Sequence, residues 1–253
     1  MRLAYNTLEY GGTPDLRRML AELKDAGWEG WEVRQSLDWL GSADRVCGIS
    51  EAAGLRVAGL CGQGWDLATN PVTFEINCRR IEFASRIGAE AFVIMSPSRP
   101  PDRSPTAGEI ASFAAAAEDL AQFGAEEGMT VAFHFHTGQM VQSQAEVCQV
   151  MNATRELRLC VDVSHAQLVD WDACECLREW SDRLAYVHLQ DYRGWRYVNI
   201  GSGGIFPSIP AIFDTLDDIG FDGWVVCHGG HFTDQPPHER ARVSRDYLRA
   251  IGR

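Results

Sequence analysis

The sequence predicts an α/β fold, a single (β/α)8 TIM barrel that takes up residues 1–253. Short apolar and β-branched runs alternate eight times with longer amphipathic stretches along the chain. Strands that alternate with helices pair in parallel through right-handed crossovers, and eight such units in about 250 residues match the usual size of a closed barrel. A doubly wound open sheet is the alternative, but residues 6–13, after the first expected strand, contain no GxGxxG motif.

The eight strands are expected where apolar and β-branched residues cluster, at residues 3–6, 29–33, 56–60, 91–95, 130–135, 157–161, 184–189 and 224–227. Helices are expected at residues 13–26, 42–53, 73–87, 106–127, 143–153, 172–182, 208–219 and 238–251. Thr13 and Pro14 suit the start of the first helix, and Gly27 suits its end. Two longer loops, residues 96–105 and 192–207, follow strands four and seven, which places both on the face where barrel loops close over substrate.

The composition describes a globular protein that does not bind nucleic acid. Apolar residues make up 45% of the chain, which is ample for a buried core, and the net charge of −12 repels phosphate backbones and anionic membranes. No apolar run approaches the roughly 18 residues of a membrane span, and the first residues lack the pattern of a signal peptide. We therefore expect a cytoplasmic protein, whose eight cysteines, without a CxxC pair, are reduced and mostly buried.

Histidines gather at the carboxyl ends of the last four expected strands. The chain has seven, and all but His238, which we expect on the surface, follow this rule: His134, His136, His165, His188, His228 and His231. Because all barrel strands direct their carboxyl ends at one rim, imidazoles from four neighbouring strands converge there. Such convergence is how a divalent cation site is assembled, although any single imidazole could be a hydrogen-bonded structural one.

Asp162, at the end of the sixth strand, adds a carboxylate to these imidazoles. This donor mixture suits Mn, Fe, Co or Zn better than Ca or Mg, so the predicted cofactor is one divalent transition metal ion. The predicted ligands are one from each of four strands: His134, Asp162, His188 and His228. Strand alternation places His134 and His136 on the same face. His136, His165 and His231 are expected close by, as orienting groups, acid–base groups or contacts to substrate hydroxyls.

At these motifs the chain resembles the xylose isomerase-like barrel superfamily, which contains sugar isomerases, keto-sugar epimerases, dehydratases and the endonuclease IV enzymes. The segment FHFHTGQMVQS (133–143) is similar to the H-x-H-x-G pattern of inosose dehydratases. VDVSHAQL (161–168) is similar to the superfamily's D-x-x-H, YVHLQDYR (186–193) to its V-H-x-x-D, and GFDGWVVCH (220–228) to its closing G-x-x-G-W-x-x-x-E. The first pattern is the most telling, because the second and third are shared across the superfamily.

The chain departs from the superfamily where a glutamate is usual. His228 stands at the end of the eighth strand, and His134 ends the fifth, where many isomerases and epimerases have Glu. The two-glutamate proton relay that the resemblance implies for epimerases is therefore absent, and the site favours softer metals such as Fe(II) or Zn(II).

The expected chemistry is removal of a proton beside a carbonyl or diol that the metal polarises, which leads through an enediolate to dehydration, isomerisation or epimerisation. His136 or His165 would serve as base or as acid for a departing hydroxyl, with Arg193 or Gln190 on substrate oxygens. Glu32 and Trp65 are further candidates for the substrate site, together with His231; for Glu32 the alternative is a solvated carboxylate at the barrel mouth, and for Trp65 it is ordinary packing.

The expected partner is a small polyol or keto-sugar, and an exposed patch of barrel helices would support a homodimer. Two other interpretations stay open. A histidine-rich Fe(II) centre could activate oxygen, or the barrel could have lost activity and merely bind a metal or polyol. An endonuclease IV activity is disfavoured, since it requires several Glu ligands and a basic surface, whereas this chain is acidic.

Overall fold

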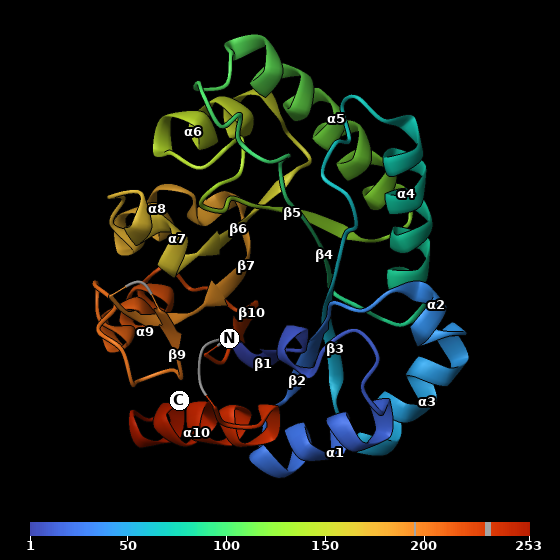
Figure 1. Ribbon diagram of the computed structural model, residues 1–253, viewed down its shortest axis with the longest axis vertical. Helices are drawn as coiled ribbons and strands as arrows, with labels where there is room; N and C mark the ends of the chain where they lie inside the picture. The colour runs from blue at the N-terminus through green and yellow to red at the C-terminus, as the bar shows by residue number, and fades with distance from the viewer. Residues whose placement is uncertain (195, 231–233) are drawn as a thin grey trace.

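The computed structural model describes residues 1–194, 196–230 and 234–253, and it shows a closed barrel of eight parallel strands in the order β1-β10-β7-β6-β5-β4-β3-β2 (Figure 1). The predicted (β/α)8 TIM barrel is confirmed. The barrel strands are β1 (Arg2–Asn6), β2 (Gly30–Val33), β3 (Arg56–Cys61), β4 (Ala91–Ile94), β5 (Thr130–His134), β6 (Arg158–Asp162), β7 (Leu184–Leu189) and β10 (Trp224–Cys227).

Helices surround the barrel (Figure 1). They are α1 (Leu16–Ala26), α2 (Leu37–Leu40), α3 (Ala43–Ala53), α4 (Pro71–Arg86), α5 (Ala107–Glu126), α6 (Gln144–Ala153), α7 (Val163–Leu168), α8 (Ala173–Glu179), α9 (Ile209–Asp218) and α10 (Pro237–Ala250), with 3-10 turns η1 (Leu8–Tyr10) and η2 (Ser181–Arg183). Among the described residues, no helix combines the length and apolarity that a membrane crossing requires.

The first helix begins later than predicted. The Asp15 side chain, and not Thr13, caps α1 by accepting a hydrogen bond from the Arg18 amide at 3.0 Å, so Pro14 lies outside the helix. Four short elements were also missed: η1, α2, α7 and the hairpin of β8 (Asp191–Arg193) and β9 (Arg196–Val198). Each is too short to show a period in the sequence.

Inside the barrel, small residues make room for two large aromatic ones. A buried cluster joins Tyr186 and Trp224 to alanines, valines and cysteines from the strands, and a second, larger cluster contains most of the other buried apolar residues. A Cβ atom on Gly59 would lie 2.7 Å from the Tyr186 hydroxyl, so only glycine fits there. All eight cysteines are free thiols, and five of them are buried, as expected for most of them.

Asp191 shapes the segment that follows β7. Its buried carboxylate accepts hydrogen bonds from the amides of Tyr192, Gly201, Gly203 and Ile205 at 2.8 to 3.2 Å. The segment between these anchors contains the β8–β9 hairpin, which reaches the carboxyl-end rim and supplies a side chain to the site there.

Candidate metal centre

A cavity of about 290 Å³ lies at the carboxyl ends of the strands. Its lining includes four of the predicted histidines; the full set is Leu8, Arg34, His134, His136, His188, Gln190, Tyr197 and His228. The cavity therefore opens at the place where the sequence predicts a functional site.

The imidazoles form a continuous group. Ring centroids lie 4.8 Å apart for His228 and His188, 4.8 Å for His188 and His134, 5.7 Å for His134 and His136, and 3.6 Å for His136 and His165. His134 and His136 both line the cavity, which confirms the alternation argument. Barrel closure thus brings together side chains that are up to 94 positions apart in the sequence, from His134 to His228.

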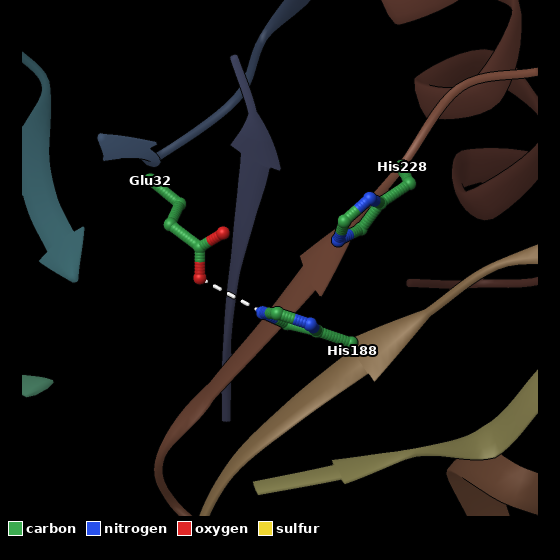
Figure 2. Close-up of side chains that lie close together, drawn as sticks. All are labelled: Glu32, His188 and His228. Carbon is green, nitrogen blue, oxygen red and sulfur yellow. Dashed lines mark hydrogen bonds and ion pairs between the residues drawn. The ribbon is translucent and has the colours of Figure 1, made fainter. Parts of the chain in front are cut away.

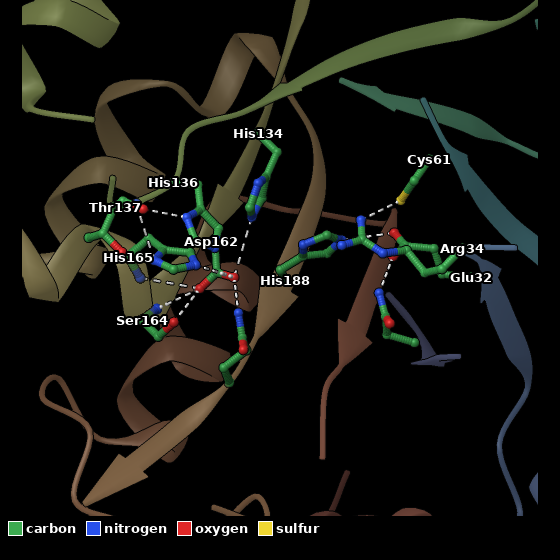
Figure 3. A network of polar contacts seen from close by, with 12 residues as sticks. Glu32, Arg34, Cys61, His134, His136, Thr137, Asp162, Ser164, His165 and His188 are labelled. Atoms are coloured by element: carbon green, nitrogen blue, oxygen red, sulfur yellow. Dashed lines mark hydrogen bonds and ion pairs between the residues drawn. The ribbon is translucent and has the colours of Figure 1, made fainter. Parts of the chain in front are cut away.

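Asp162 is held by the helix that follows it (Figure 3). It caps α7, because its Oδ1 accepts hydrogen bonds from the amide and hydroxyl of Ser164 at 2.9 and 2.7 Å. Its Oδ2 faces His134 Nε2 at 3.4 Å and His165 Nε2 at 3.8 Å, and accepts a hydrogen bond from Gln190. Burial raises the pKa of Asp162, but His165 and His134 outweigh it and keep the pKa well below its usual value.

Glu32 lies on the side of His188 that faces away from Asp162 (Figure 3), and Figure 2 shows its contact with the ring. Its Oε2 is 2.8 Å from His188 Nε2, and its Oε1 accepts a hydrogen bond from Asn6. The side chain is fully buried, so the alternative of a solvated carboxylate is wrong. Burial raises the pKa of Glu32, but its contact with His188 outweighs burial, and the pKa lies below its usual value.

Burial disfavours the charged form of four of these imidazoles, His134, His136, His165 and His228. Burial lowers the pKa of His134 to about 3 and that of His165 to about 4, and it also lowers the pKa values of His136 and His228. Neutral imidazoles keep a lone pair on one ring nitrogen, which is the form that binds a metal or accepts a proton.

The donor atoms fall into two groups that could hold a metal ion. Glu32, His188 and His228 form one, and His134, Asp162 and His165 form the other; within each group the ligand atoms lie within 4.8 Å of one another. The structure therefore divides the four predicted ligands between two groups, with His134 and Asp162 in one and His188 and His228 in the other. That division arises because Asp162 turns toward its own helix while Glu32 reaches His188 from β2.

These residues fit a divalent metal ion. Two ligand atoms about 2.1 Å from a tetrahedral ion lie about 3.4 Å apart, and His134 Nε2 and Asp162 Oδ2 have that spacing, at 3.4 Å. This distance is long for a hydrogen bond. His165 Nε2 and His188 Nδ1 are buried and have no hydrogen-bond partner among the described residues. Buried ring nitrogens without partners are unfavourable unless something binds them.

The other predicted site residues lie in different places. Gln190 lines the cavity. Arg193 is exposed and donates to the Ser202 carbonyl, and Trp65 packs beside Gly62; neither is among the described residues that line the cavity. His231 lies outside the described residues. The roles expected for Arg193, Trp65 and His231 stay predictions.

Sequence reasoning missed three residues of the cavity: the apolar Leu8 and the polar Arg34 and Tyr197. Arg34 follows Glu32 by two positions, and side chains two positions apart along a strand point to the same face. The alternation could therefore have predicted that Arg34 lies beside Glu32. Its guanidinium lies 2.9 Å from the Cys61 sulfur, and Glu32 and Cys61 raise its pKa despite burial. Tyr197 comes from β9 and gave no signal, because the sequence shows only a glycine-rich loop there.

Comparisons with known proteins agree with this architecture. A family model described as a xylose isomerase-like TIM barrel matches residues 20–251. Inosose dehydratase from Geobacillus kaustophilus (strain HTA426) is 26% identical over 144 residues, which cover 49% of this chain and 46% of that protein. Rhizopine catabolism protein MocC from Rhizobium meliloti is 26% identical over 266 residues, 91% of this chain and 78% of that protein. The chain spans 46% and 50% of the inosose dehydratases of two Geobacillus species.

Solved structures share the fold. The 3-keto-D-glucoside 4-epimerase YcjR from E. coli superposes with a TM-score of 0.82 at 20% identity, over 100% of this chain and 99% of that one. The IOLI protein, whose crystal structure has a binding zinc atom, superposes with a TM-score of 0.78 at 17% identity, over 100% and 96% of the two chains. At such identities the likeness shows the fold alone.

Proposed function

Because the chain belongs to the xylose isomerase-like TIM-barrel family, we propose that it is a divalent-metal-dependent lyase or isomerase that acts on a keto-polyol or sugar-like substrate. The observation that carries the proposal is the pair of His134 Nε2 and Asp162 Oδ2, which lie 3.4 Å apart among buried imidazoles of lowered pKa at the mouth of the barrel. Its inosose dehydratase relatives support a dehydration.

The proposed ligands are those predicted from the sequence: His134 of β5, Asp162 of β6, His188 of β7 and His228, which directly follows β10. When bound, the ion supplies a Lewis acid that polarises a substrate carbonyl and lowers the pKa of the adjacent C–H bond. Mn, Fe, Co and Zn all suit this donor set.

His136 is the proposed general base. Its Nδ1 is 2.6 Å from the Thr137 carbonyl, and a nitrogen that donates to a carbonyl carries the proton. The lone pair of the neutral ring is therefore on Nε2, on a side chain that lines the cavity. His136 takes the proton from the carbon next to the carbonyl, and the C–H electron pair moves into a new C=C bond.

Dehydration requires a proton for the departing hydroxyl. After the first step His136 carries a proton, so it is also the proposed acid; His165, whose ring stacks on His136 with centroids 3.6 Å apart, is the proposed residue that holds it in place. The β C–O bond breaks, its electron pair leaves with oxygen, and the proton that His136 removed completes a water molecule. His136 is then neutral again. If His136 returns the proton to a different carbon or face, the same site isomerises or epimerises the substrate.

The size and lining of the site suit a polyol. Arg34 and Gln190 present hydrogen-bond donors to the first cavity. A second cavity of about 400 Å³, lined by Thr137, Gln142, Leu168, Val169, Tyr192, Gly194 and Tyr197, shares Tyr197 with the first. We propose that it receives the part of the substrate that lies away from the reacting carbon.

Solvent-deuterium exchange tests the proposal without knowledge of the product. The purified protein is stripped with a chelator, loaded with Mn, Fe, Co or Zn in turn, and incubated in D2O with keto-inositols, ketohexoses and 3-keto-glucosides. Deuterium uptake or substrate consumption, followed by NMR and mass spectrometry, is expected with at least one metal and is lost in His136→Gln. If every loaded form binds metal stoichiometrically and exchanges no proton of any substrate, the proposed chemistry is wrong, and a barrel that only binds a metal or polyol is favoured.

One observation favours a second candidate, an oxygen-activating Fe(II) enzyme. Each of the two donor groups contains two histidines and one carboxylate, the ligand set of non-haem Fe(II) oxygenases. Iron content after anaerobic purification, and oxygen consumption with the same substrates, separate this activity from a lyase or isomerase.

A further inference from the structure

Glu32 and His188 form a buried pair across the barrel mouth. Strands β2 and β7 are separated by β1 and β10 in the barrel, yet Glu32 Oε2 lies 2.8 Å from His188 Nε2. Neither side chain is more than 1% exposed. Such a carboxylate needs hydrogen-bond donors, and its two oxygens receive them from His188 and from Asn6.

This contact decides which nitrogen of His188 keeps a lone pair. An ionised carboxylate only accepts hydrogen bonds, so Nε2 of His188 carries a proton, and Nδ1 is the nitrogen on which the neutral ring keeps its lone pair. His188 Nδ1 is buried and has no hydrogen-bond partner among the described residues. Figure 3 shows the ring between Glu32 on one side and His134 and Asp162 on the other, and the centroids of the His188 and His134 rings are 4.8 Å apart.

We propose that Glu32 is the positioning residue of the metal site: it fixes His188 in the orientation and tautomer in which Nδ1 binds the ion. A carboxylate behind a metal-binding histidine raises the basicity of the ligand and prevents its rotation. Residue 228, directly after β10, is a histidine and not a carboxylate. The second carboxylate of the site is instead Glu32 of β2, which contacts the ligand His188 and not the ion. The inference rests on the proposed metal site, but not on the reaction performed there.

Glu32→Gln should disturb the hydrogen bonds around His188, because both polar neighbours of Glu32 are donors. Asn6 Nδ2 and His188 Nε2–H both donate to Glu32, whereas glutamine has one acceptor oxygen and one NH2 group. If the oxygen stays with Asn6, the NH2 group donates to His188 Nε2, and the ring proton moves to Nδ1, where it blocks metal binding. If the oxygen stays with His188, two NH2 groups oppose each other.

The double variant Asn6→Asp with Glu32→Gln removes this conflict. The new aspartate accepts from the glutamine NH2 group, which leaves the glutamine oxygen to accept from His188 Nε2–H. Asn6 Oδ1 already accepts from the Leu8 amide at 2.8 Å, a contact that aspartate retains. The ring therefore returns to the tautomer with the lone pair on Nδ1.

The test measures Zn(II) affinity of the full chain by competition with a chromophoric chelator, together with metal content per chain and the visible spectrum of the Co(II)-loaded protein. We expect one ion per chain, an affinity about 10- to 100-fold weaker in Glu32→Gln, a shifted Co(II) spectrum, and recovery to within about threefold in the double variant. Glu9→Gln is the matched control, because it neutralises another buried carboxylate, one that accepts from the Tyr5 hydroxyl at 2.7 Å and leaves His188 untouched.

Three results would overturn the proposal: unchanged Zn(II) affinity in Glu32→Gln, no recovery in the double variant, or two ions per wild-type chain with one lost in Glu32→Gln. The last would make Glu32 a direct ligand of a second ion with His188 and His228. If Glu32→Gln does not fold without metal, Glu32→Asp, which keeps the charge but withdraws it from His188, must show the same weakening. Failure of catalysis with metal affinity as expected would count against the proposed function only.

Discussion

Replacing Asp191 by asparagine should loosen the segment that completes the cavity. The Asp191 side chain is 2% exposed, and it joins the amides of Tyr192, Gly201, Gly203 and Ile205. A Cβ on Gly203 would lie 2.2 Å from Asp191 Oδ1, so the backbone approaches the carboxylate as closely as only glycine allows. Asparagine has the same shape and lacks one acceptor oxygen.

The size of the effect follows from the bonds that are lost. Oδ1 accepts from Tyr192 and Ile205, and Oδ2 accepts from Gly201 and Gly203. The amide group of asparagine can replace one oxygen only, so two backbone N–H groups would face an NH2 group. A hydrogen bond to a charged group contributes roughly 1.5 to 3 kcal/mol, and partial relaxation of the loop brings the expected loss of unfolding free energy to about 2 to 4 kcal/mol.

Urea denaturation at pH 7 measures the effect, and hydrogen exchange of the amides in residues 196–205 locates it. Asp102→Asn is the control, because it removes the same charge from an exposed side chain and should change the unfolding free energy by less than about 0.5 kcal/mol. An Asp191→Asn variant as stable as this control, with unchanged exchange, would refute the idea that the carboxylate holds the segment in place.

Three further predictions concern pH, catalysis and metal removal. Burial raises the pKa of Glu146, but its bonds to the Ser143 and Gln142 amides and to Arg99 keep the pKa below its usual value. It therefore stabilises the fold above its unfolded pKa of about 4.3 and this contribution is lost as the pH falls, so Glu146→Gln should flatten the loss of stability in urea between about pH 5 and 3. His136→Gln should lower turnover about 10²- to 10⁴-fold, measured as substrate consumption, and should leave the metal content unchanged. Chelation should lower the midpoint of thermal unfolding, and added Zn(II) should restore it, because the folded state alone presents the ligands together.

The sequence predicted most of the barrel because its signals are local and repeat. Each strand is a short apolar run between a helix and a turn, and parallel pairing follows from that alternation. The errors have local causes too. Asp15 is a stronger helix cap than the threonine two residues before it, and the six residues of α7 are too few to show a helical period.

The histidines of the site and Asp162 were predictable, whereas the contact of His188 with Glu32 and the position of Tyr197 were not. Fold and position placed His134, His136, His165, His188 and His228 at one rim, since strand ends converge whatever the details of packing. The contact between Glu32 and His188 depends on a carboxylate that crosses the barrel mouth from a strand that is not a neighbour, and no spacing in the sequence encodes it. Tyr197 depends in the same way on the Asp191 contacts that shape its loop.

The charges at the rim constrain the substrate as much as the ligands do. Asp162 and Glu32 are ionised, since the pKa of each lies below its usual value, so a divalent ion would balance the summed charge of these two carboxylates. Of the described side chains that line the cavity, Arg34 is the one that stays cationic at any physiological pH, and Glu32 and Cys61 already lie beside it. A phosphorylated sugar would find little positive charge there to bind it. A neutral polyol that becomes anionic only when His136 removes its proton would instead gain from Arg34 at the moment the charge develops, which is when electrostatic stabilisation speeds a reaction.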